Sequence, residues 1–366
     1  MINESKGCLV LENGTVFWGT RLGAKQNIIA ETVFATGMNG YLETLTDPSY
    51  YGQTVVQTFP LIGNYGVIPE DFESRKPFLS AYIVSDCCEA PSNFRCKGTL
   101  SEWLESQNIP ALCGVDTRTL TRMLRDCGTM NGMICNSPEE ADLEAIKAYR
   151  VQNAVRSTTF DKPYTLGDAN AALHVALMDY GAKANIARCL IKRGCRVTVL
   201  PADTTAEQIS ALKPDGIMLS NGAGDPAENT DLIAELKKIT ELKIPMMAIC
   251  LGHQLLALAN GIQTSKLKFG HRGANQPVQN TETNKLSITT QNHGYQVLYD
   301  PADIHCRETA DLLYININDN TCEGLRYRNF PAISVQFHPE ACAGPQDTES
   351  LFDTFIDMMG GAETCR

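Results

Sequence analysis

The chain has 366 residues, 14 cysteines and a formal net charge of −11, and its length allows two domains that each bury a core. The acidic balance argues against nucleic acid or an anionic membrane as a partner, because both bind basic surfaces. The first ten residues lack the basic start and apolar stretch of a signal peptide, and no window reaches the roughly 18 apolar residues of a membrane span. We therefore expect a cytoplasmic protein with reduced cysteines.

The first part of the chain, 1–150, is predicted to form a β-rich α+β domain. Two short strands joined by an Asn13-Gly14 turn are predicted over 8–23, and a further strand over 81–86. Helical patterns occupy 98–108, 116–128 and 137–149.

Two of these helices carry terminal signals. Asp116 is placed to cap the second helix and Gly128 to terminate it. In the third, Ser137 and Glu140 form a capping-box pattern, so we expect that helix to begin directly after Ser137.

The residue pattern changes after the first domain. The segment 151–171 is polar and weakly patterned, and we interpret it as a linker to a C-terminal domain, 172–366. From 173 to 261 short apolar strands alternate with helices. This alternation predicts an α/β domain with a doubly wound, mostly parallel sheet covered on both faces.

The end of the chain has a different pattern. Residues 264–340 are predicted as mostly extended segments with antiparallel hairpins. An amphipathic helix is predicted over 347–361, with Asp347 as its cap.

Cys250 stands where an apolar strand turns into an apolar helix, in "PMMAICLGHQLLALANG". In parallel sheets, ligands bind beyond the carboxyl ends of the strands, and a helix N-terminus favours the thiolate. The small residues Ala248 and Gly252 flank the cysteine, as a sharp strand-to-helix turn requires. The turn predicts either a nucleophile or a packed thiol, and it does not by itself decide between them.

His338 and Glu340 are the candidate partners of that thiol. Pro339 keeps His338 out of the α region, so the two side chains face the same side of an extended segment. A carboxylate beside an imidazole can orient it and stabilise its charged form. The alternative is an HPE turn without function. His253, one helical turn after Cys250, is interpreted as a packing residue.

Two polar segments complete the candidate site. "LSNGAGDP" (219–226) is a glycine loop after a strand, where Gly222 and Gly224 permit close backbone approach. It is not a phosphate loop, because the pattern GxxxxGK[ST] does not occur in the chain. "TTQNHGYQV" (289–297) offers amides and backbone suited to a small zwitterion, although a polar hairpin turn would have the same composition.

These segments together resemble one family. "ICLGHQLLALANG", "SNGAGDP", "QNHGY" and "QFHPEACAGP" resemble the class I (triad) glutamine amidotransferases. "FGHRGANQPV" and "TGMNGYLETLTDPSYYGQTVVQTFPLIGNYG" resemble, within that class, the small-subunit family of carbamoyl-phosphate synthetase. The resemblance covers nearly the whole chain in the same order.

The resemblance implies a glutaminase half-enzyme in which Cys250 is the nucleophile, His338 the base and Glu340 the orienting acid. The positions that match an L-glutamine pocket are Ser49, Gly222, Gly224, Leu251, Gln254, Asn292, Gly294 and Tyr295. The implied partner is a large synthetase subunit that receives ammonia in a heterodimer and uses ATP and bicarbonate to make carbamoyl phosphate for arginine and pyrimidine synthesis. No cofactor or metal is expected in this chain, and ATP and Mg²⁺ are expected on the large subunit.

The chain departs from the family's usual residues at four positions. Ala248 and Ala223 stand where glycine and proline are usual, Tyr295 where phenylalanine is common, and Gln276 where histidine is common. Ala248 is the most significant, because its methyl group could strain the turn before Cys250. Since alanine is small, we expect activity to survive.

Two alternatives stay open. One is another cysteine hydrolase on the same sheet, such as a γ-glutamyl peptide hydrolase, which substrate profiling would separate because it would not prefer free glutamine. The other is a non-catalytic scaffold with a vestigial triad, which the intact Cys250, His338 and Glu340 argue against. Thiol alkylation with and without protecting glutamine would decide it.

Overall fold

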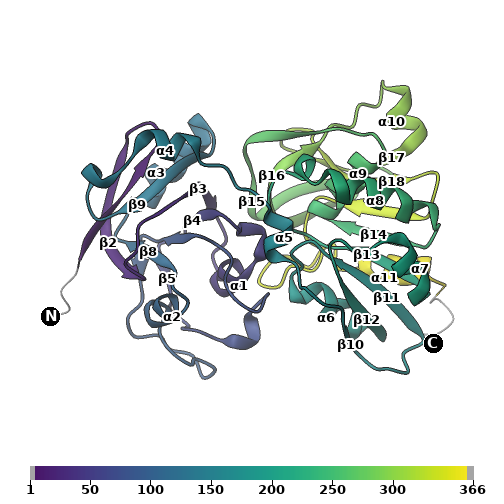
Figure 1. Ribbon diagram of the computed structural model, residues 1–366, viewed down its shortest axis with the longest axis horizontal. Helices are drawn as coiled ribbons and strands as arrows, with labels where there is room; N and C mark the ends of the chain where they lie inside the picture. Colours follow the sequence, from purple (N-terminus) through teal and green to yellow (C-terminus); the bar gives the residue numbers. More distant parts are fainter. Residues whose placement is uncertain (1–4, 361–366) are drawn as a thin grey trace. The chain divides into compact units, whose positions relative to one another are not determined.

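Residues 5–360 are described by a computed structural model, in which the chain divides into two units, Met1–Ala154 and Val155–Arg366. Figure 1 labels the helices and strands of each unit. No helix within residues 5–360 combines the length and the apolar character needed to cross a bilayer.

Seven strands of the first unit close into a barrel in the order β1-β2-β8-β6-β4-β3-β9. The predicted hairpin is present, since β1 and β2 pair antiparallel around Gly14, whose φ of +83° suits glycine. The barrel closes because β1 also pairs with β9, with Cys8 opposite Cys135. The strands are β1 (Lys6–Leu11), β2 (Val16–Gly23), β3 (Ile28–Ala35), β4 (Gln53–Gln57), β6 (Ala81–Ile83), β8 (Pro110–Cys113) and β9 (Met130–Cys135).

Short elements surround this barrel. They are α1 (Tyr41–Thr46), η1 (Pro48–Tyr50), β5 (Leu61–Ile62), η2 (Pro69–Asp71), β7 (Asp86–Cys87), α2 (Leu100–Ser106), α3 (Thr117–Cys127), η3 (Pro138–Glu140) and α4 (Leu143–Ala148). The signals predicted for α3 are confirmed: the Asp116 carboxylate accepts the Thr119 N–H, and the helix ends at Gly128.

The helix predicted over 137–149 is wrong in its first half. The chain makes only the 3₁₀ turn η3 and then passes through Ala141, which has extended backbone angles. α4 begins after Asp142, whose carboxylate accepts the N–H groups of Glu144 and Ala145. Asp142 satisfies two of the free amides that every helix start exposes, whereas Ser137 makes no capping bond.

Ten strands of the second unit form one sheet in the order β10-β12-β11-β13-β14-β19-β18-β16-β15-β17. Five neighbouring strands run parallel, namely β12, β11, β13, β14 and β19. The remaining strands pair antiparallel with their neighbours. The strands are β10 (Tyr164–Leu166), β11 (Leu173–Asp179), β12 (Cys195–Pro201), β13 (Gly216–Leu219), β14 (Met246–Ile249), β15 (Thr264–Asn280), β16 (Leu286–Val297), β17 (Ala310–Asn316), β18 (Cys322–Tyr327) and β19 (Ala332–Val335). The mixed α/β class is confirmed, but the parallel part is smaller than predicted, because the extended segments after 264 join the same sheet.

Helices cover both faces of the parallel strands. The alternation along β11 shows this, because Val175 and Leu177 belong to one buried cluster, and Ala176 and Met178 to the other. α6 and α11 pack on the first face, and α7, α8 and α9 on the second. The helices of this unit are α5 (Ala154–Thr158), α6 (Ala184–Lys192), α7 (Ala206–Leu212), η4 (Pro226–Glu228), α8 (Thr230–Glu241), α9 (Leu251–Ala259), α10 (Ile304–Thr309) and α11 (Leu351–Met358).

Two further predictions need correction. The segment 151–171 is not a plain linker, because it carries α5 and the strand β10, which pairs antiparallel with β12. β10 is exposed along its whole length, so no apolar pattern marks it. The last helix begins at Leu351, and Asp347 does not cap it: its carboxylate accepts the Ile288 N–H of β16 instead. Residue 361, the predicted end of that helix, lies outside the described residues.

Candidate active site

Cys250 occupies a strained turn between β14 and α9. Its φ of +53° and ψ of −104° are unusual for a residue with a side chain, as at the nucleophile elbow of other hydrolases. The Cys250 N–H donates to the Val335 carbonyl (2.8 Å), and the Gly252 N–H donates to that of Ser220 (3.0 Å). A Cβ at Gly252 would lie 2.6 Å from the Leu219 carbonyl oxygen, so only glycine lets α9 pack this close to β13.

His338 and Glu340 follow β19, the parallel neighbour of β14, so they reach the same edge of the sheet as Cys250. His338 Nδ1 lies 2.7 Å from Glu340 Oε1. Within the described part of the chain, His338 Nε2 has no hydrogen-bond partner, and the Cys250 thiol is near enough to act on the charge of the ring. Burial and Lys183 lower the pKa of His338, but Glu340 and the nearby Cys250 side chain outweigh them and raise it to about 9. The site therefore favours an imidazolium.

Lys183 is a member of the site that the sequence reasoning missed. Its ammonium lies 2.7 Å from Glu340 Oε1, and both side chains are buried. Burial alone would raise the pKa of Glu340, but the charges of Lys183 and His338 lower it to about 2. A signal was present: Lys183 follows the apolar strand 173–179, at another carboxyl end of the same parallel sheet.

The strand β16 runs beside the start of α9. The Cys250 sulfur lies 3.9 Å from the Asn292 carbonyl oxygen, and Gln254 Nε2 donates to the Tyr295 carbonyl at 2.9 Å. Arg272 from β15 donates to Asn292 Oδ1 and so orients that amide. The Asn292 and Tyr295 carbonyls thus lie beside the thiol and Gln254, and Gly294 stands between these two residues in the strand.

The glycine loop lies against Leu251. A Cβ at Gly222 would meet the Tyr180 carbonyl oxygen at 2.2 Å and the Leu251 side chain at 2.6 Å, and Gly224 has a φ of +89°. Leu251 is the first residue of α9, so its N–H has no acceptor carbonyl within the helix. The loop thus packs against Leu251, the residue that directly follows Cys250.

Three other predicted positions have clear surroundings. Ser49 lies in η1 of the first unit, where its N–H donates to Asp47 Oδ1 (2.9 Å), and its role in a glutamine site stays a prediction. His253 is fully buried with Nδ1 2.7 Å from Ser334 Oγ, and burial lowers its pKa to about 3, which suits a packing role. Ala248 is buried inside β14, opposite Leu219 and Ser334, and is not among the residues with positive φ.

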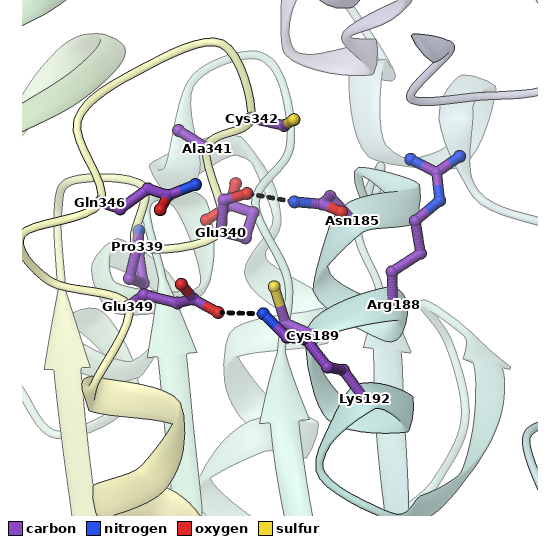
Figure 2. Close-up of a pocket in the computed structure, with 10 residues that line it drawn as sticks. All are labelled: Asn185, Arg188, Cys189, Lys192, Pro339, Glu340, Ala341, Cys342, Gln346 and Glu349. Carbon is purple, nitrogen blue, oxygen red and sulfur yellow. Dashed lines mark hydrogen bonds and ion pairs between the residues drawn. The ribbon is translucent and has the colours of Figure 1, made fainter. Parts of the chain in front are cut away.

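A cavity of about 140 Å³ reaches Glu340 between α6 and the segment after Pro339 (Figure 2). Asn185 donates to the Glu340 carbonyl oxygen, and Lys192 pairs with Glu349 along its wall. Its lining does not include Cys250 or any candidate glutamine position. The cavity therefore contacts Glu340 but is not the predicted substrate site.

Comparisons with known proteins agree with this geometry. Residues 176–358 match the family described as glutamine amidotransferase class-I, and residues 9–134 match carbamoyl-phosphate synthase small chain, CPSase domain. The carbamoyl phosphate synthase small chain of Bacillus thuringiensis subsp. konkukian (strain 97-27) is 48% identical over 98% of both chains. The pyrimidine-specific small chain of Bacillus subtilis (strain 168) is 47% identical over 97% of this chain and 96% of its own.

A solved glutamine amidotransferase from Thermotoga maritima is similar over 52% of this chain and 85% of its own, with 16% identity and a TM-score of 0.37. The second unit, with its cysteine turn and His–Glu pair, is a class I glutamine amidotransferase domain, and the chain is an enzyme of that class. Since the match extends through both units, the chain belongs to the carbamoyl-phosphate synthase small-chain family.

Proposed function

We propose that this chain hydrolyses L-glutamine at Cys250 and supplies the ammonia to a large, ATP-using synthase subunit. One observation carries the proposal: the strained Cys250 turn follows β14, the neighbouring strand β19 is followed by a buried His338 whose Nδ1 lies 2.7 Å from Glu340, and Glu340 is paired in turn with Lys183. A merely packed thiol would require neither the backbone strain nor the adjacent ion pair.

In the proposed reaction the Cys250 thiolate attacks the side-chain carboxamide of glutamine. Amides of Leu251 and of the loop 222–224 stabilise the oxyanion. His338 gives its proton to the departing ammonia, and the carbon–nitrogen bond breaks to leave a γ-glutamyl thioester. His338 then takes a proton from water, whose oxygen attacks the thioester and releases glutamate and the thiolate. The proposed glutamine contacts are Ser49, Gly222, Gly224, Leu251, Gln254, Asn292, Gly294 and Tyr295.

The proposed partner is the large chain of a carbamoyl-phosphate synthase, in a heterodimer that works in the cytoplasm. The names of the relatives support this, because a small chain implies a large one. ATP and Mg²⁺ would bind to that partner. The name of the Bacillus subtilis relative supports pyrimidine synthesis as one destination of the carbamoyl phosphate, and arginine synthesis is proposed beside it.

The first prediction tests the nucleophile. Cys250→Ser is expected to lower glutamine hydrolysis at least a thousandfold, because an alcohol is not ionised at neutral pH, while the assembled synthase still uses free ammonia. Release of glutamate and formation of carbamoyl phosphate from each nitrogen source are the measurements. Cys127→Ser, at an exposed position of the first unit, is the control and should keep both activities. Full glutamine hydrolysis by Cys250→Ser would overturn the assignment.

A further inference from the structure

A second cluster of chemically active side chains lies in the antiparallel part of the sheet. His271 on β15, His293 on β16 and Glu323 on β18 are all buried, and their ligand-type atoms lie within 4.8 Å of one another. None of the three belongs to the catalytic trio proposed above. Two imidazoles and one carboxylate are a ligand set that suits Zn²⁺.

Each member of the cluster is oriented by an outer partner. His271 Nε2 lies 2.7 Å from Asp319 Oδ2, and His293 Nδ1 lies 2.7 Å from the Tyr295 carbonyl oxygen. The Glu323 carboxylate accepts from the side-chain amides of Asn316 (3.0 Å) and Gln291 (2.9 Å). A carboxylate or carbonyl behind each ligating histidine, and hydrogen bonds on the ligating carboxylate, are typical of metal sites.

A separate polar mismatch points to a cation. Gln291 donates through Nε2 to Glu323, so its Oε1 faces His293 Nε2, at 2.9 Å. Both ring nitrogens of His293 therefore face oxygen acceptors, and a neutral imidazole has only one N–H to satisfy them. On the other ring, His271 Nδ1 is buried and faces Glu323 Oε1 at 3.3 Å. A positive ion beside His293 Nε2 and the Gln291 oxygen removes the mismatch on His293.

We propose that His271, His293 and Glu323 bind one Zn²⁺-like divalent cation. Bonds of about 2.0–2.1 Å in a tetrahedron place neighbouring ligand atoms roughly 3.3 Å apart, and His271 Nδ1 already lies 3.3 Å from Glu323 Oε1. The His293 ligand atom lies within 4.8 Å of the other two, and the Gln291 oxygen or a water completes the four ligands. The ion has no step in glutamine hydrolysis.

The role of this site is structural. It joins three strands, β15, β16 and β18, at the point where β16 continues through Gly294 to Tyr295. Asn292 and Gly294 alternate with His293 along the strand, so they face the opposite side of the sheet. The cation thus braces the strand that lies beside Cys250, and the inference does not depend on which substrate that thiol attacks.

The test uses the full-length chain, freed of metal by a chelator and titrated with Co²⁺ as a spectroscopic substitute for Zn²⁺. The expected result is one equivalent bound, with the visible d–d bands of a tetrahedral nitrogen and oxygen site, and displacement by Zn²⁺. Because the chain has 14 cysteines, the spectrum must lack thiolate-to-cobalt charge transfer. A cobalt spectrum dominated by thiolate, or no stoichiometric binding, would overturn the proposal.

Matched variants locate the ion. Asp319→Asn removes only the carboxylate behind His271 at a partly exposed position, and should weaken binding about tenfold to a hundredfold. Glu323→Gln should abolish binding. Glu308→Gln, an exposed change on α10, is the control and should bind like the parent chain. If Glu323→Gln does not fold, Asp319→Asn still decides, because equal affinity in Asp319→Asn and the control contradicts the site.

Discussion

The Glu340 carboxylate is buried and held between two cationic groups. Its Oε1 lies 2.7 Å from both the Lys183 ammonium and His338 Nδ1. A buried carboxylate with a single partner would be costly to keep ionised, and the second cation offsets that cost. Lys183 thus keeps Glu340 charged, and the charged Glu340 keeps His338 protonated beside the thiol.

The second prediction concerns the stability that Lys183 provides. Lys183→Met should lower the free energy of unfolding by about 3 kcal/mol at pH 7, because it removes one partner of a buried ion pair. The pKa of Glu340, about 2 when folded, lies below its ordinary value of 4.5, so its ionised form stabilises the fold above pH 4.5. That contribution is lost as the pH falls from 4.5 to about 2. The difference between parent and variant should therefore shrink across this range.

Denaturant unfolding at several pH values measures this difference. Lys192→Met is the matched control, because Lys192 pairs with Glu349 at an exposed position and should contribute about 1 kcal/mol or less. An equal, pH-independent loss in both variants would show that Lys183 acts only through packing.

The third prediction concerns the pH dependence of catalysis. The pKa of His338, raised to about 9, means that the ring is an acid below that pH and loses its proton above it. Glutamine hydrolysis should decline as the pH rises through about 9, because no proton is then available for the leaving ammonia. Glu340→Gln removes a charge that raises this pKa, so the decline should move to lower pH as well as the rate falling. The rate of glutamine hydrolysis as a function of pH, for the parent chain and for Glu340→Gln, measures the shift. If the decline at high pH does not move in Glu340→Gln, another group causes it.

Much of this site could be predicted from single residues. Cys250, His338 and Glu340 carry local signals: a small-residue turn, and a histidine and carboxylate two apart in an extended segment. Lys183 could not be assigned, because a lysine after a strand is usually a solvated charge and only the three-dimensional fold brings it to Glu340. The Arg272–Asn292 bond was missed for the same reason: it joins two strands across a hairpin.

At the scale of elements, β14, the Cys250 turn and α9 act as one unit. The strain is confined to Cys250, since Ala248 has an ordinary strand conformation and its methyl group packs in the core. The alanine at a position where glycine is usual in the family therefore fills space in a strand and need not distort the turn.

The fourth prediction follows from this location. Ala248→Gly should lower the free energy of unfolding by about 1 kcal/mol, because glycine in a strand loses more backbone freedom on folding, and should leave the rate of glutamine hydrolysis unchanged. Thermal unfolding and the steady-state rate are the measurements. Ala332→Gly, also buried and on the neighbouring strand β19, is the control and should show a similar loss. A higher rate in Ala248→Gly alone would show that the methyl group does strain the turn.

Elements with strong local signals were predicted well, and the others were not. α3 has a capping Asp116 and a terminal Gly128, and both act as expected. The start of α4 was misplaced because the predicted cap, Ser137, makes no capping bond, whereas Asp142, five residues further on, does. β10 has no buried face, so its pairing with β12 depends on backbone hydrogen bonds that side-chain patterns do not report.

At the scale of the whole molecule, each unit has cores of its own. The two large clusters on the faces of the ten-stranded sheet contain only residues from Val155 onward. The cluster inside the first unit contains only residues before the boundary at Ala154. The barrel itself was not predicted, because its closure pairs β1 with β9 across most of that unit, and such distant pairing has no local signal.

The fifth prediction tests this division. A chain of residues 155–366 should fold and unfold cooperatively, since its core residues are all present, but its KM for glutamine should rise about tenfold if Ser49 supplies one hydrogen bond. Ser49→Ala in the full chain should give the same rise without a change in stability. Circular dichroism and glutaminase kinetics measure both. An unchanged KM in Ser49→Ala would remove Ser49 from the proposed pocket.

The closure of the barrel limits how a partner can bind to this part of the first unit. The seven described strands of the barrel leave no free edge. Long open edges invite strand addition and aggregation, and the closed barrel offers none. A protein that assembles with this barrel must therefore recognise side chains, and specificity will be found in shape and charge, with little contribution from backbone pairing.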